Sequence, residues 1–146
     1  MSEKKNIAAT RCLFEEVFSG GDLDALDSLI ANNIKLHDPS AKNFKGGIEA
    51  FRDREEMYTH AFPNKTLTID EIYGSSDTVT VRWTAKGTHD RDLPGVPSTG
   101  KKFTVTGTSL FKYKNGKIIE IWQNWDEFGL LNQLGALSAK SYAAQR

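Results

Sequence analysis

The chain has 146 residues with 19 basic and 19 acidic side chains, which suits one domain and excludes the basic surface that nucleic acids and anionic membranes attract. A single cysteine, Cys12, excludes an internal disulfide bond and a cysteine-rich zinc site. No apolar run reaches the roughly 20 residues of a membrane span, and the N-terminal lysines lack the apolar stretch of a signal peptide. We therefore expect one cytoplasmic domain over residues 1–146, with its core at about 7–137.

Helical spacing of apolar residues dominates the first part of the chain. Residues 3–19 predict a helix that a pair of glycines ends. Asp22 is a good N-cap for a second helix, and a third is expected over 47–62. Between them, residues 33–39 ("NIKLHDP") alternate as a short strand that ends at proline.

After Pro63 the period of the pattern changes from helical to alternating. A short last helix, capped by Asp126, is expected over 126–137. Helices followed by hairpin-connected strands predict an α+β fold, with helices packed on one face of a curved antiparallel sheet. The expected strands cover residues 66–74, 78–89, 101–113 and 117–125.

The turn at residues 115–116 ("NG") decides which residues of the last two strands share a face. A two-residue type I′ turn would pair Lys114 with Lys117, whereas a three-residue loop would pair Tyr113 with Lys117. We predict the longer loop, because it gathers the apolar residues on one face and the buried face sets the register. The predicted buried face comprises Val105, Ser109, Phe111, Ile119, Ile121, Gln123 and Trp125.

An antiparallel sheet that curls around a helix leaves a cavity at its open end. Polar residues with the parity of the buried face are the candidates for catalysis there: Asp38, Ser109 and Gln123. Asp38 precedes a proline, so it either forms only an Asx-type turn or acts as a partly desolvated general base. The candidate ligand-binding walls are aromatic: Phe14, Tyr58, Trp83 and Trp125.

The histidines leave alternatives open. His37 has the opposite parity to the buried face, so it is either an exposed histidine or, if Pro39 twists the strand, a ligand-binding one. His89 stands in a loop rich in proline and glycine, where it is either solvated or part of a lid at the mouth of the cavity. The three histidines occupy separate elements without ligand spacing, so no metal site is expected.

Five segments carry a resemblance to a known family: "FSGGDLDALDSLIANNIKLHDP", "RWTAKGTH", "LPGVPSTGK", "FKYKNGKIIEIWQNWD" and "GLLNQLG". The chain resembles the SnoaL-like polyketide cyclases of the nuclear-transport-factor-two-like superfamily from about residue 7 to 137. The resemblance implies a cone-shaped α+β barrel with a deep apolar pocket for a small molecule. It also implies no metal, no organic cofactor and homo-oligomers.

The resemblance implies roles for individual residues. The acid/base aspartate of the polyketide cyclases falls on Gln123 and their assisting histidine falls on Ser109. Compared with ketosteroid isomerases, the base aspartate matches Asp38, the oxyanion-donating tyrosine falls on Phe14 and the oxyanion aspartic acid falls on Ser109. An amide such as that of Gln123 cannot take a substrate proton as a carboxylate does.

Two hypotheses for function follow. The first is a cofactor-independent enzyme for an apolar carbonyl compound, doing cyclisation, isomerisation or dehydration. Asp38 would be its base, and Ser109 and Gln123 would donate hydrogen bonds to the enolate oxygen. The second is a non-catalytic ligand-binding or interaction domain of the same fold.

The sheet face opposite the predicted pocket is rich in β-branched residues and carries an extra tryptophan. Such a face is a plausible partner surface. We therefore predict a homodimer joined through this face. Its residues are Thr104, Thr106, Thr108, Leu110, Ile118 and Trp122.

Overall fold

The computed structural model describes residues 2–137 of the chain. The helical segments are α1 (Ser2–Cys12), the π-helix η1 (Leu13–Ser19), η2 (Leu23–Ala25), α2 (Leu26–Leu29), η3 (Pro39–Ala41), α3 (Ile48–Ala61) and α4 (Glu127–Gln133). The strands are β1 (Ile30–His37), β2 (Thr66–Ser75), β3 (Thr78–Thr88), β4 (Lys102–Lys114) and β5 (Lys117–Trp125). No helix among residues 2–137 is long and apolar enough to cross a membrane.

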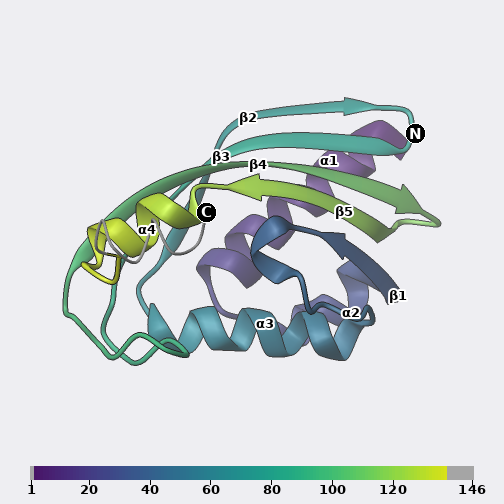
Figure 1. The fold of residues 1–146 in the computed structure, drawn as a ribbon. Helices are drawn as coiled ribbons and strands as arrows, with labels where there is room; N and C mark the ends of the chain where they lie inside the picture. Colours follow the sequence, from purple (N-terminus) through teal and green to yellow (C-terminus); the bar gives the residue numbers. More distant parts are fainter. Residues whose placement is uncertain (1, 138–146) are drawn as a thin grey trace.

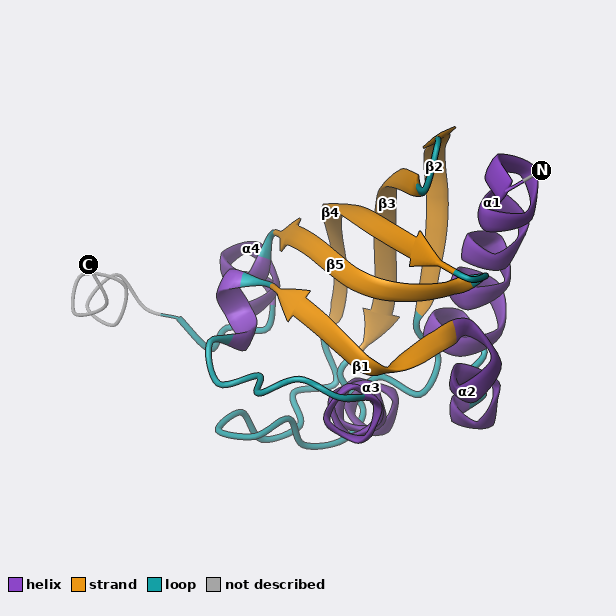
Figure 2. Cartoon of the chain, turned by 90° about the vertical axis from the view of Figure 1, so that its right-hand side faces the viewer, coloured by secondary structure: helices purple, strands orange, loops and turns teal. Residues whose placement is uncertain are grey.

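The five strands form one sheet in the order β1-β5-β4-β3-β2. The sheet curves over α1, α2 and α3, while α4 closes one end (Figure 1). Turned by 90°, the molecule shows α3 end-on beneath the concave face, between β1 and the loops (Figure 2). The predicted α+β class, with helices on one face of a curved sheet, is confirmed.

One strand departs from the predicted antiparallel arrangement. β1 pairs with β5 in parallel, whereas the other neighbouring strands are antiparallel. Two-residue turns join β2 to β3 and β4 to β5, and the loop 89–101 joins β3 to β4; each connection returns the chain in the opposite direction. β1 and β5 are instead separated by α3 and three strands. That long connection leaves β1 free to run parallel to its neighbour.

The turn between β4 and β5 differs from the predicted three-residue loop. Lys114 pairs with Lys117, so the loop has two residues. Asn115 and Gly116 both have positive φ values, 52° and 81°. Asparagine and glycine are the residues that tolerate this conformation, which the type I′ turn requires at both positions. The prediction of the longer loop was wrong.

A β-bulge next to the turn restores the predicted faces. Tyr113 pairs with Ile118 but Lys112 pairs with Glu120, so Ile119 is an extra residue in β5. Ile118 is consequently buried, and it takes the inward position predicted for Ile119. Beyond the bulge Phe111 pairs with Ile121 and Ser109 with Gln123. The predicted faces therefore hold, although the register differs by two residues from the one that follows from pairing Tyr113 with Lys117.

The ends of the helices show which capping predictions hold. Asp126 caps α4, because its carboxylate accepts a hydrogen bond from the backbone N–H of Gly129 at 2.8 Å. Asp22 occupies the N-cap position of η2, but its side chain makes no capping hydrogen bond. α3 begins after Gly47 and ends before Phe62, close to the predicted bounds. These ends set the length of the helix that forms one wall of the site.

Candidate functional site

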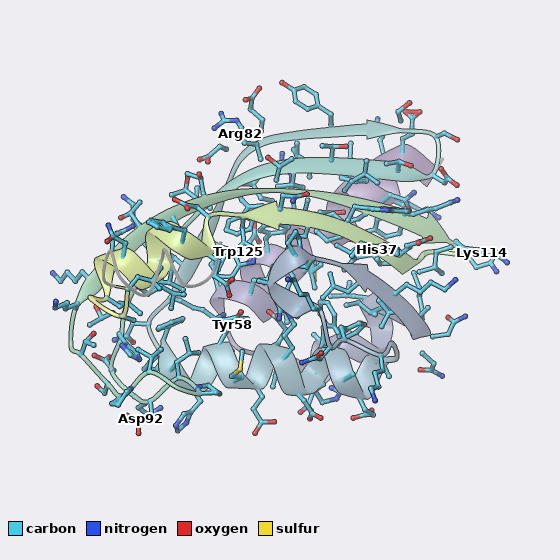
Figure 3. All side chains as sticks on the ribbon, viewed as in Figure 1. His37, Tyr58, Arg82, Asp92, Lys114 and Trp125 are labelled. Carbon is cyan, nitrogen blue, oxygen red and sulfur yellow. The ribbon has the colours of Figure 1, made fainter. Side chains whose placement is uncertain are left out.

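A cavity of about 90 Å³ lies between α3 and the concave face of the sheet. On the same measure a single buried water needs ~10–15 Å³, so the space exceeds one water several times over. Tyr58 and Trp125 both line it, and Figure 3 shows Tyr58 on the side of α3 and Trp125 on the side of β5. The wall comprises Phe18, Leu36, Phe51, Arg54, Glu55, Tyr58, Phe62, Lys65, Leu67, Trp83, Ala85, Phe103, Val105, Gln123, Trp125 and Leu130. Most of these side chains are apolar, as small-molecule pockets require.

Gln123 is held in this wall by a chain of hydrogen bonds. The indole N–H of Trp83 donates to the Ser109 hydroxyl at 2.9 Å. Because that oxygen already accepts, its own hydrogen is free to donate, and it does so to Gln123 Oε1 at 2.8 Å. The Gln123 Nε2 then donates to Asp38 Oδ2 at 3.0 Å. The chain fixes both ends of the amide.

Asp38 sits behind the wall rather than in it. Its carboxylate accepts hydrogen bonds from the Ser40 backbone N–H (2.8 Å) and hydroxyl (2.8 Å), from Arg54 Nη2 (3.1 Å) and from Gln123. Its side chain is only 1% exposed. The contact with the Ser40 backbone is the Asx-type turn that the sequence offered as one alternative. The same carboxylate also orients two wall residues, Arg54 and Gln123.

The predicted aromatic residues Tyr58 and Trp125 meet across the cavity. Their ring centroids are 6.2 Å apart at 90°, an edge-to-face contact. The Trp125 indole N–H donates to the Ser40 hydroxyl at 3.0 Å. Burial raises the pKa of Tyr58 to about 12, so its phenol keeps its proton at neutral pH and can donate it in a hydrogen bond.

Glu55 is a wall residue that the sequence interpretation missed. Phe51, Glu55, Tyr58 and Phe62 follow one another at spacings of four, three and four residues, so they form one stripe along α3 that faces the cavity. Burial raises the pKa of the Glu55 carboxyl, although the positive charges of Lys65 and Arg54 act to lower it. A carboxylate in the phase of an apolar helical stripe was the signal that could have found it.

Lys65 is another buried charged residue at the cavity. Its ammonium donates a hydrogen bond to the Phe18 carbonyl oxygen, near the C-terminal end of η1. Burial lowers its pKa, and the nearby Glu55 charge opposes that shift. Lys65 therefore belongs to the folded framework and places a cation in the wall.

His37 and Phe14 lie away from the cavity. His37 is on the outer face of the sheet, where its side chain is 49% exposed. Its ring stacks on Trp122 with centroids 5.1 Å apart, and its Nε2 lies 2.6 Å from a Glu120 carboxylate oxygen. Phe14 is part of the core, edge-on to Phe18. Neither residue lines the cavity. His37 points outward because of its position in the alternation of β1, and Phe14 is one of the buried residues of η1.

His89 is buried behind the wall, neither solvated nor in the wall. Its Nδ1 lies 3.0 Å from the Thr99 hydroxyl, on the opposite arm of the loop. Its ring packs edge-on against Phe62, which does line the cavity. Its Nε2 has no hydrogen-bond partner within residues 2–137. No group of three or more histidine, cysteine, aspartate or glutamate side chains in the described part of the chain could hold a metal ion.

Comparison with known proteins assigns the fold to a family. A family model described as SnoaL-like polyketide cyclase matches residues 8–134. The chain belongs to the SnoaL-like polyketide cyclase family. The predicted resemblance to these proteins and to the nuclear-transport-factor-two-like fold is therefore confirmed. No curated protein matches the chain at a significant level.

Solved structures of the SnoaL-like family share the whole fold. IdmH from Streptomyces antibioticus, proposed to be a polyketide cyclase, is 31% identical with a TM-score of 0.78, over 89% of this chain and 98% of that one. A proposed polyketide cyclase from Acidithiobacillus ferrooxidans is 28% identical with a TM-score of 0.82, over 92% and 96%. A SnoaL-like protein from Jannaschia sp. CCS1 is 22% identical with a TM-score of 0.85, over 94% and 96%, which shows the fold alone.

Proposed function

We propose that this SnoaL-like protein binds a small, largely apolar, carbonyl-bearing molecule between α3 and the sheet, and that Gln123 donates a hydrogen bond to the carbonyl oxygen of the ligand. The observation that carries the proposal is a fixed amide in an apolar wall. An amide nitrogen has two hydrogens, and Asp38 takes one of them. The other is available to a ligand oxygen.

The rest of the wall supports the same ligand class. Aromatic and aliphatic side chains on both sides supply apolar contact area, and few polar groups are present to fix an orientation. Tyr58 adds a neutral phenol. Polyketides are chains with repeated carbonyl groups, so the family assignment agrees with a carbonyl-bearing ligand.

The contacts of Gln123, Ser109 and Asp38 suit binding and positioning, not proton transfer. Gln123 cannot accept a proton as the corresponding aspartate of the cyclases would, so it serves in binding. Ser109 acts through Gln123, because its hydroxyl is committed to Trp83 and to that amide. Asp38 likewise positions Gln123 and Arg54. If these three residues were the only polar groups at the pocket, the protein would bind a ligand without catalysing a reaction.

A matched pair of probes tests the proposal. 2-Tetralone and its hydrocarbon analogue tetralin have nearly the same shape, but only the ketone has an oxygen that can accept a hydrogen bond. Trp83 and Trp125 stand in the wall, so quenching of tryptophan fluorescence reports binding. We expect the ketone to bind more tightly than tetralin. Equal binding of the two probes, or binding of neither, would contradict the proposed role of Gln123.

We further propose that a second copy of the chain covers the outer face of the sheet. Trp122 is 39% exposed there and pairs with Leu110, and the same face carries exposed threonines at 104, 106 and 108. No helix covers this face in the described residues (Figure 1). One member of the predicted patch does not belong to it, because Ile118 is fully buried on the inner face.

A further inference from the structure

The geometry points to Glu55 as the proton-transfer group of the pocket, which acts on a carbon–hydrogen bond next to the carbonyl of the ligand. The inference rests on the proposed function, since it needs a carbonyl compound in the cavity. It assigns catalysis to α3, on the opposite wall from the strand position where the resemblance to polyketide cyclases places their aspartate.

The position of Glu55 is the first support. The helical stripe that holds it also holds Phe51, Tyr58 and Phe62, and all of them are wall residues. A carboxylate within an apolar stripe is unfavourable for folding, because removal from water penalises its charge. A charged residue that breaks the local pattern in this way is expected at functional sites.

The second support is that the Glu55 carboxyl is not engaged by the protein. Within residues 2–137 it makes no side-chain hydrogen bond and no ion pair, whereas Asp38 accepts four hydrogen bonds. A group that exchanges protons with a ligand must be within hydrogen-bond reach of it. Of these two carboxylates only Glu55 is in the wall of the cavity.

The charges around Glu55 form the third support. Arg54 is held by Asp38 and Lys65 is held by the Phe18 carbonyl, so both cations stay near Glu55 without an ion pair to it. Burial and the Asp38 charge raise the pKa of Glu55, and the two cations moderate the rise. A carboxyl whose pKa is moved upward toward neutrality can both accept and return a proton.

The proposed step balances without a cofactor. The Glu55 carboxylate removes a proton from the α-carbon, and the electron pair of the broken C–H bond forms the C=C bond of an enolate. The carbonyl π electrons move to the oxygen, which accepts a hydrogen bond from Gln123 Nε2. Glu55 then returns the proton to carbon. If the enolate carbon first bonds to a second carbonyl carbon of the same molecule, the resulting alkoxide takes that proton and a ring has closed.

The experiment follows exchange of deuterium from solvent into the α-carbons of 2-tetralone by proton NMR. We expect the wild-type protein to accelerate exchange above the rate in buffer. Glu55→Gln should reduce the protein-catalysed exchange rate by about 10²-fold or more, the usual contribution of a general base. Glu55→Asp should keep part of it. Glu56→Gln, at the exposed neighbouring position on α3, is the matched control and should keep the wild-type rate.

Binding of 2-tetralone, measured by tryptophan fluorescence on the same samples, separates the two proposals. If the ketone binds but the wild type does not accelerate exchange, or if Glu55→Gln exchanges as fast as the wild type, the role of Glu55 is wrong while the binding proposal stands. If the ketone does not bind, the proposed function itself fails. In the wild type, acceleration should increase with pH as the Glu55 carboxyl ionises, and Glu55→Gln should show no such increase.

Discussion

The side-chain amide of Gln123 lies 3.0 Å from the carboxylate of Asp38, although 85 residues separate them in the chain. The contact joins β5 to the end of β1, the strand that pairs with it in parallel. Because Ser109 holds the other end of the amide, Gln123 presents a fixed orientation to the cavity. An amide held in this way is suited to select ligands by their hydrogen-bond acceptors.

Gln123→Leu should weaken binding of 2-tetralone by roughly 1–3 kcal/mol, because the ligand oxygen then lacks its donor. Asn124→Leu also replaces a side-chain amide by leucine, on the adjacent, exposed residue of β5, and should leave binding unchanged. Fluorescence titration of both variants measures the difference. Equal affinities of the two variants for 2-tetralone would mean that Gln123 does not contact the ligand.

Gln123→Glu keeps the size of the side chain but places a second carboxyl group against Asp38. Two carboxylates about 3 Å apart resist simultaneous ionisation, so one of them should hold a proton in the folded state. The folded variant then binds more protons than its unfolded chain, and its stability should decrease as pH rises. Thermal unfolding followed by circular dichroism should show the variant close to wild type at acid pH and well below it at neutral pH. A loss of thermal stability that is the same at every pH would contradict the contact between residue 123 and Asp38.

Glu55→Gln should change how stability depends on pH. Burial raises the pKa of the Glu55 carboxyl in the folded state above its ordinary value of 4.5. The folded protein therefore retains this proton at pH values where the unfolded chain has lost it. The associated stability is fully present below pH 4.5 and is lost as pH rises through the raised pKa.

The glutamine variant lacks this titration, so it should become more stable relative to wild type as pH increases from about 4.5 to neutrality. Urea unfolding at several pH values measures the difference between the two free energies of unfolding. Glu56→Gln, which changes an exposed carboxylate on the same helix, should show no such trend. A parallel pH dependence of wild type and Glu55→Gln would mean that the carboxyl is not desolvated in solution.

Trp122→Glu should weaken self-association through the outer face of the sheet. It would remove the indole that stacks on His37 and place a carboxylate beside Leu110 in the proposed contact, where burying a charge is costly. Sedimentation velocity at micromolar concentration measures the oligomeric state. Lys114→Glu serves as the control, because Lys114 lies at the tip of the β4–β5 hairpin (Figure 3), four residues along β4 from Leu110, the partner of Trp122. A monomeric wild type, or a dimer that tolerates Trp122→Glu, would show that the face has another role.

Local patterns in the sequence determined the order and class of the elements. The change of period after Pro63 separates α3 from the strands, and the alternation of Val79 and Val81 with threonines defines the buried face of β3. These signals are local, because each side chain's direction follows from the backbone period. The α+β class and the buried faces around Ser109 and Gln123 were predictable for that reason.

Only the tertiary structure decided which polar atoms meet. The bulge at Ile119 offsets the two-residue turn and keeps the apolar residues on one face. The local sequence pattern does not predict that bulge. The two alternatives for Asp38 could be compared only once Ser40, Arg54 and Gln123 were seen around its carboxylate. The role proposed for Glu55 depends on the apolar wall around its carboxyl, which forms only in the folded protein. Hydrogen bonding and desolvation depend on neighbours that are distant in the chain, so the chemistry of this pocket is a property of the folded protein.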